Sequence, residues 1–173
     1  MFEEYLQDAH VFISYANSQA EERDARRYYR AAVFYAAGAV EAFMNYVTDS
    51  LIGGKVLSDV EKAYLTDKAL TFDNGNHIEK TEFHSLEGKL KVLIRKFSPK
   101  FDFGTATWCK LMEFKELRDL LIHPKQSEDD IKISDYQKKI SDGLKSIIYI
   151  TNSINEGVFG KSFRKQITDL IPD

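Results

Sequence analysis

Apolar residues recur at helical spacing along most of the chain. The clearest run begins at Val33, where apolar side chains return every three or four residues until Gly53 and Gly54 interrupt the pattern. This spacing places the side chains on one face of a helix, and glycine is typical of a helix end. The pattern predicts one long helix over residues 23–51, whose buried positions are Val33, Ala36, Ala37, Val40, Met44, Val47 and Leu51.

Two shorter helices are predicted in the first half of the chain. One covers residues 5–16 and is either a separate helix or the beginning of the long one. The other begins after Ser58, a favourable N-cap residue, and is broken by the turn-forming residues 73–76. The positions that share a face are Tyr5, Ala9, Ile13 and Ala16 in the first helix, and Val60, Tyr64 and Leu65 in the second.

Three further helices are predicted in the second half. They begin after Thr81, at Thr105 and at Ser134, and the first two end at prolines, which disfavour helical conformation in the preceding residue. Residues 147–151 alone resemble a strand, but the helical repeat continues for about five turns and decides the assignment. The acidic residues 127–130 are expected to form a loop. The apolar faces are Leu86, Leu90, Leu93 and Ile94; Leu111, Phe114, Leu117 and Leu121; and Tyr136, Ile140, Leu144, Ile147, Thr151 and Ile154.

The order of these elements favours an all-α fold. Residues 10–16 resemble the first strand of TIR signalling domains, but such a domain would continue with short strands alternating with helices, and a long helical pattern follows here. The chain contains no internal repeat and no low-complexity segment. We therefore expect one domain over residues 1–173, a compact bundle of about five to six helices.

The composition is that of a mildly acidic globular chain. The 27 Asp and Glu outnumber the 24 Lys and Arg. A pI near 5.8 argues against a surface built wholly for nucleic acid but does not exclude a local basic patch. The longest apolar run, residues 31–40, is shorter than the roughly 20 residues that span a membrane. The N-terminus is acidic where a signal peptide is basic. We expect a cytoplasmic protein that does not enter the membrane.

Cysteine and histidine offer little for a metal site. The single Cys109 excludes an internal disulfide and a cysteine-based zinc site, and fits a reducing compartment. His10, His77 and His84 lack the spacing of metal ligands, and no glycine-rich phosphate loop is present. We therefore expect neither a metal nor another cofactor.

The residues best suited to chemistry lie at the end of the fifth predicted helix. Arg118 and His123 are separated by four residues and in a continuous helix would point about 140° apart. Pro124 disfavours the helical conformation for His123, so the helix should end there and the imidazole can turn back toward Arg118. Asp119, four residues before His123, is placed to hydrogen-bond to that imidazole.

This segment resembles the signature of the HEPN superfamily, in which Arg, a polar residue, a short apolar stretch and His follow one another: here Arg118, Asp119, residues 120–122 and His123. The long helix carrying Glu41 and Asn45 is similar to the helix that bears Glu and a following Asn in many such domains. The resemblance covers most of the chain. It implies a metal-independent ribonuclease, commonly from a toxin–antitoxin or phage-defence system, that acts as a homodimer with the two motifs meeting across the interface.

The same residues suit RNA cleavage on chemical grounds. RNA carries its own nucleophile, the 2′-hydroxyl, so cleavage needs a base, an acid and a cation for the phosphorane charge. Histidine and arginine supply these groups. Each chain provides one His123, so a two-fold dimer would complete the set and give a 2′,3′-cyclic phosphate and a 5′-hydroxyl. Alternatively, Arg118 pairs with neighbouring acids and His123 only caps a helix C-terminus.

Glu41 and Asn45 lie one helical turn apart inside the most apolar stretch of the chain. In one interpretation Glu41 bonds to Arg118 and orients it, while Asn45 supports the site or touches substrate. In the other, the two residues belong to a buried polar network that ties two helices together. The two interpretations are compatible.

A run of basic residues lies in the fourth predicted helix and just after it: Lys89, Lys91, Arg95, Lys96 and Lys100. No acid interrupts it. Such a run can follow an RNA backbone, or it can be the solvated face of a helix.

The sequence therefore predicts a homodimeric HEPN-like ribonuclease with Arg118 and His123 as the catalytic pair and Asp119 and Glu41 in support. The alternative is a non-catalytic helical dimer that binds a protein partner, such as a nucleotidyltransferase antitoxin or a larger defence complex.

Overall fold

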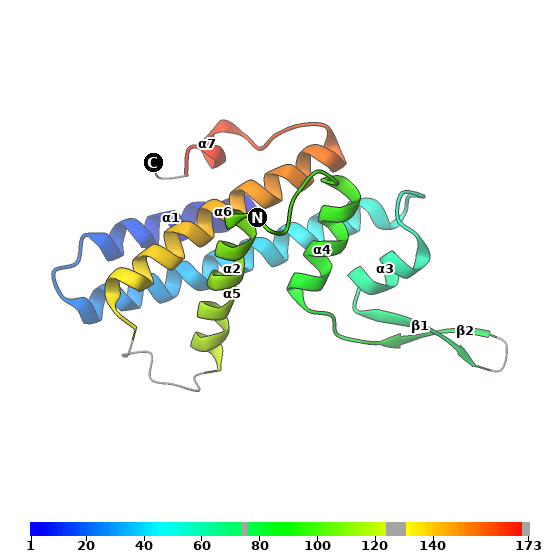
Figure 1. Ribbon diagram of the computed structural model, residues 1–173, viewed down its shortest axis with the longest axis horizontal. Helices are drawn as coiled ribbons and strands as arrows, with labels where there is room; N and C mark the ends of the chain where they lie inside the picture. The colour runs from blue at the N-terminus through cyan, green and yellow to red at the C-terminus, as the bar shows by residue number, and fades with distance from the viewer. Residues whose placement is uncertain (74–75, 124–130, 171–173) are drawn as a thin grey trace.

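Long helices make up most of the molecule. The computed structural model describes residues 1–73, 76–123 and 131–170 (Figure 1). Its helices are α1 (Phe2–Asn17), α2 (Glu22–Ile52), α3 (Asp59–Leu65), α4 (Leu86–Phe97), α5 (Ala106–Ile122), α6 (Ile133–Phe159) and the short α7 (Lys165–Thr168). The all-α prediction is confirmed, and each of the longer helices begins and ends within a few residues of its predicted limits. The four-residue α7 was not predicted.

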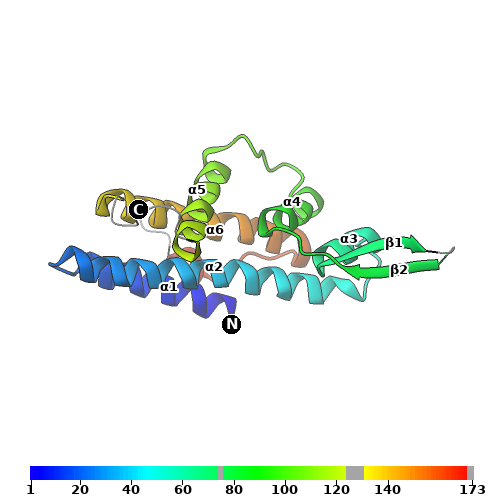
Figure 2. The same cartoon turned by 90° about the horizontal axis from the view of Figure 1, so that it is seen from below.

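Helices α1, α2 and α6 run along the length of the molecule (Figure 2). A turn at residues 18–21 separates α1 from α2, so the first predicted helix is a separate one. Residues 10–16 are helical, which excludes the TIR-like strand. The predicted apolar faces of α2 and α6 are buried throughout, except that Leu51 is only half-buried.

Helix α5 crosses α2 and α6 steeply in both views (Figure 1 and Figure 2). Helix α5 contacts both of these helices, and its buried side chains are Trp108, Leu111, Phe114 and Leu117. A glycine makes the close crossing with α6 possible, since a Cβ at Gly143 would lie only 2.5 Å from the Phe114 ring. This crossing brings the C-terminal end of α5, where the predicted motif lies, beside the middle of α2.

A β-hairpin that the sequence pattern did not predict projects from the helices. Strand β1 (Lys68–Asp73) pairs antiparallel with β2 (Asn76–Thr81), with Lys68 opposite Thr81. Residues 73–76 were expected only to break a helix. Asn-Gly between alternating segments is in fact a strong hairpin signal, and the strands are too short for their period to stand out.

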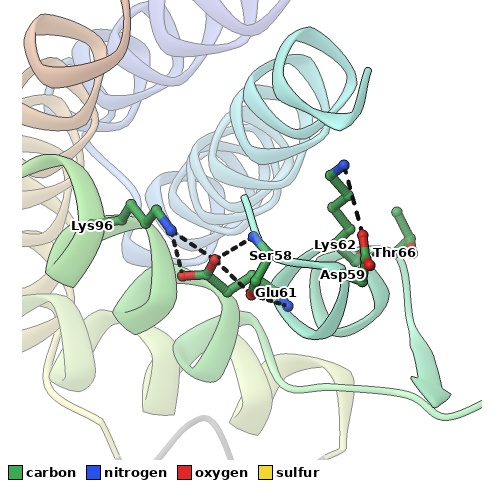
Figure 3. A network of polar contacts seen from close by, with 6 residues as sticks. All are labelled: Ser58, Asp59, Glu61, Lys62, Thr66 and Lys96. Carbon is green, nitrogen blue, oxygen red and sulfur yellow. Dashed lines mark hydrogen bonds and ion pairs between the residues drawn. The ribbon is translucent and has the colours of Figure 1, made fainter. Parts of the chain in front are cut away.

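A polar network holds α3 against α4 (Figure 3). Ser58 caps α3 as predicted: its Oγ accepts from the Glu61 amide at 3.3 Å, and its own amide donates to Glu61 Oε2 at 2.7 Å. Lys96 Nζ lies 2.7 Å from the same carboxylate oxygen. The hydrogen bonds from Lys96 and from the Ser58 amide lower the pKa of Glu61 from its ordinary 4.5 to about 2. Val60 does not share the buried face as predicted, because its side chain points to solvent and is 69% exposed.

Among the described residues, no helix is both long and apolar enough to cross a membrane.

Candidate functional site

Arg118 connects α5 to α2. The buried neighbour Leu117 faces the core, which leaves Arg118 one-third exposed at the edge of the α5–α2 contact. There its Nη2 lies 3.2 Å from Oε1 of Glu41. The predicted contact between Glu41 and Arg118 is thus confirmed, and it fixes one side of the guanidinium plane against α2.

Asp119 holds the other side of the guanidinium. Its Oδ1 accepts a hydrogen bond from Arg118 Nη1 at 3.0 Å, and its Oδ2 accepts one from Lys115 Nζ at 2.7 Å. Burial raises the pKa of Asp119, but the hydrogen bonds and charges of Lys115 and Arg118 outweigh burial, so the pKa lies below its ordinary value. Asp119 therefore remains ionised at neutral pH and helps to keep Arg118 in place.

His123 directly follows the last residue of α5. Its backbone has left the helical region (φ −126°, ψ 70°), as Pro124 led us to expect, and its amide donates to the Asp119 carbonyl at 2.9 Å. The side chain is exposed. The expected hydrogen bond between the imidazole and the Asp119 carboxylate is not formed within the described residues, because Lys115, one turn before Asp119, and Arg118 occupy that carboxylate.

Glu41 and Asn45 both lie on the solvent side of α2, so their assignment to a buried polar network is wrong. The side chain of Glu41 is 52% exposed. The apolar stretch around them misled the prediction, since its small and branched residues turn one face to the core and leave the stripe of Phe34, Glu41 and Asn45 outside. Asn45 makes no side-chain hydrogen bond within the described part of the chain.

A cavity of about 250 Å³ adjoins Arg118 between α2, α4 and α5. Its wall is apolar and includes Ala37 and Val40 of α2, Leu90 of α4, and Leu111 and Phe114 of α5. The sequence did not reveal it, because the cavity depends on the angle at which three helices meet and no local pattern encodes that angle.

The edge of this cavity is polar. Arg118, Lys115 and Asp119 line one side, and Ser85 and Glu87 line another at the beginning of α4. Asp119 also borders a second, more open hollow of about 780 Å³ that His123 lines. Asp119 thus lies between the apolar cavity and the hollow that bears His123, whereas Arg118 lines only the cavity.

The basic run of α4 is largely engaged in ion pairs. Lys89 Nζ lies 2.6 Å from Asp67, Lys91 Nζ lies 2.6 Å from Glu87, and Lys96 is held by Glu61 as described above. Arg95 lies over the Phe103 ring, and Lys100 is exposed. These ion pairs agree with the interpretation of the basic run as the solvated face of a helix. An RNA contact along Lys89, Lys91, Arg95, Lys96 and Lys100 stays a prediction.

In the described segments, no three His, Cys, Asp or Glu side chains gather in a way that could hold a metal ion. No family model, curated protein or solved structure matches the chain. The resemblance to the HEPN superfamily therefore stays an expectation that rests on the motif.

Proposed function

We propose that this protein is a metal-independent endoribonuclease of the HEPN type that acts as a homodimer. The observation that carries the proposal is the placement of Arg118. A carboxylate from another helix orients it, it remains partly exposed, and it lies on the same helix end as the exposed His123. A purely structural ion pair would not require a histidine at this position.

Arg118 is the group that binds the scissile phosphate. Its guanidinium has five N–H donors in a planar fork that matches phosphate oxygens. Glu41 and Asp119 each accept a hydrogen bond from one terminal nitrogen of Arg118, and together they fix the plane of the guanidinium. Such positioning reduces the reorganisation needed when negative charge grows on the phosphorane.

His123 transfers protons. One His123 takes the proton of the 2′-hydroxyl as its oxygen attacks phosphorus, and the His123 of the second copy gives a proton to the 5′-oxygen as the P–O5′ bond breaks. The products are a 2′,3′-cyclic phosphate and a 5′-hydroxyl. Exposed apolar side chains next to the site support an interface there: Phe34, on the stripe of Glu41, is 46% exposed, and Ile122, next to His123, is 39% exposed.

The test is a cleavage assay in EDTA with purified protein and total RNA. We expect cleavage that leaves 2′,3′-cyclic phosphate ends, and its loss in Arg118→Ala. Arg118→Lys, which keeps the charge but not the fork, should be intermediate. Arg27→Ala is the matched control, because Arg27 also pairs with an acid, Asp24, but lies on an exposed part of α2 away from the site. Absence of cleavage by the wild-type dimer would instead favour a non-catalytic module that binds a protein partner.

A further inference from the structure

We propose that the cavity between α2, α4 and α5 is a nucleobase subsite, which holds the base next to the phosphate bound by Arg118. This proposal rests on the proposed ribonuclease function and specifies how the substrate is seated. The cavity and the guanidinium are contiguous, since Arg118 itself lines the opening.

The size of the cavity suits one ring system. Its volume of about 250 Å³ lies below the roughly 300–1,000 Å³ that pockets for drug-sized ligands occupy. Phe114, which is 3% exposed, is the aromatic residue in its lining and can contact the flat face of a ring. Met112, half-buried in the same wall, adapts its shape readily to a ligand.

The polar edge favours a base over an alkyl chain. Glu87 lines the opening, and in the described part of the chain Lys91 binds only its Oε1, so the amino or ring N–H groups of a base can bond to its Oε2. An aliphatic acid would place its carboxylate on Arg118 but would cover Glu87 Oε2 without giving it a hydrogen-bond donor, which costs free energy. The combination of an apolar wall, oxygen atoms at the edge and an adjoining guanidinium therefore fits a nucleotide.

The apolar wall also implies weak base selection. Sequence is normally read through hydrogen bonds to base edges, and here only the edge of the cavity carries polar groups. Stacking and shape complementarity do not distinguish one base from another, because every base has a flat apolar face. We expect the subsite to accept any base and to add affinity rather than sequence specificity.

The test is calorimetric titration of the dimer in EDTA with adenosine 5′-monophosphate, ribose 5-phosphate and octanoate. We expect the nucleotide to bind about tenfold more tightly than the sugar phosphate, in line with the contribution of one stacked base. Ala37→Leu and Met112→Phe fill the cavity from two helices and should remove this advantage without weakening ribose 5-phosphate. Val158→Phe lies at a half-buried position on α6 outside the cavity. It should change neither the affinity for the nucleotide nor the affinity for ribose 5-phosphate.

Equal affinity for the nucleotide and the sugar phosphate would overturn the subsite, as would unchanged nucleotide binding in both folded filling variants. Tighter binding of octanoate than of the nucleotide would identify an aliphatic-acid site and overturn it as well. Because binding is measured without cleavage, the two proposals fail separately. Cleavage without a nucleotide advantage contradicts only the subsite, and a nucleotide advantage without cleavage contradicts only the ribonuclease.

Discussion

Arg118 and Glu41 lie 77 positions apart in the sequence, and the structure brings them within 3.2 Å of each other across α5 and α2. Both side chains are partly exposed, so the pair contributes little to folding, about 0–1 kcal/mol for pairs of this kind. Its main consequence is the orientation of the guanidinium.

Glu41→Ala should therefore separate stability from activity. We expect the free energy of unfolding to fall by less than about 1 kcal/mol, while the cleavage rate falls about tenfold or more because Arg118 loses one of its two anchors. Urea unfolding and cleavage kinetics on the same preparation check this. Asp24→Ala, which breaks the exposed pair with Arg27, is the control and should leave the rate unchanged. Equal rates in Glu41→Ala and wild type would contradict the orienting role.

Gly143→Ala should disturb the site through packing. Its methyl group would meet Phe114 at about 2.5 Å, so α5 must shift, and such overpacking costs about 1–3 kcal/mol. Gly53→Ala is a matched control, since a Cβ there meets nothing within 4 Å. Urea unfolding should show a lower free energy of unfolding for Gly143→Ala and almost no change for Gly53→Ala. Equal stability of the two variants would mean that the α5–α6 crossing tolerates a side chain at Gly143.

Phe34→Glu should dissociate the proposed dimer, because it places a charge on the exposed stripe of α2 that also carries Glu41. Light scattering should report a two-fold dimer for the wild type at micromolar concentration and a monomer without cleavage activity for the variant. Tyr149→Glu, at a similarly exposed aromatic residue on α6, should remain dimeric and active. A monomer with full activity would contradict the shared site.

The ion pair between Glu61 and Lys96 predicts a pH dependence of stability. Because folding lowers the pKa of Glu61 from 4.5 to about 2, its contribution is complete above pH 4.5 and is lost as the pH falls toward 2. Lys96→Ala should cost up to about 1 kcal/mol at pH 7, and the difference from wild type should shrink over that interval. Urea unfolding between pH 3 and 7 measures it, with Lys100→Ala as the exposed control. A difference that stays constant with pH would contradict the assigned pKa.

The helices were predictable from the sequence wherever the apolar repeat was long. The face of α2 from Val33 to Val47 and the end of α5 before Pro124 follow from local rules, namely helical period and proline sterics. The hairpin at Lys68–Asp73 and Asn76–Thr81 was missed because its arms are short.

The site was only partly predictable, because tertiary packing decides several of its contacts. Asp119 had basic or titratable neighbours one turn away on both sides, Lys115 and His123, and the sequence did not indicate that Lys115 would bind it. The exposure of Glu41 depends on which face of α2 the core takes, and the cavity beside Arg118 depends on three helices at once.

The central claim is that His123 moves protons without a metal. The direct measurement is the rate of RNA cleavage in EDTA as a function of pH, for wild type and for His123→Ala. Histidine side chains ordinarily titrate near pH 6.5, so an acid and a base of this type should give a bell-shaped profile with its maximum between about pH 6 and 7.5. We expect this profile for the wild type and its loss in the folded, dimeric variant. Activity that requires Mg²⁺ or Mn²⁺, a rate that rises without a maximum to about pH 9, or equal rates in the variant would contradict it and leave His123 as the residue that ends α5.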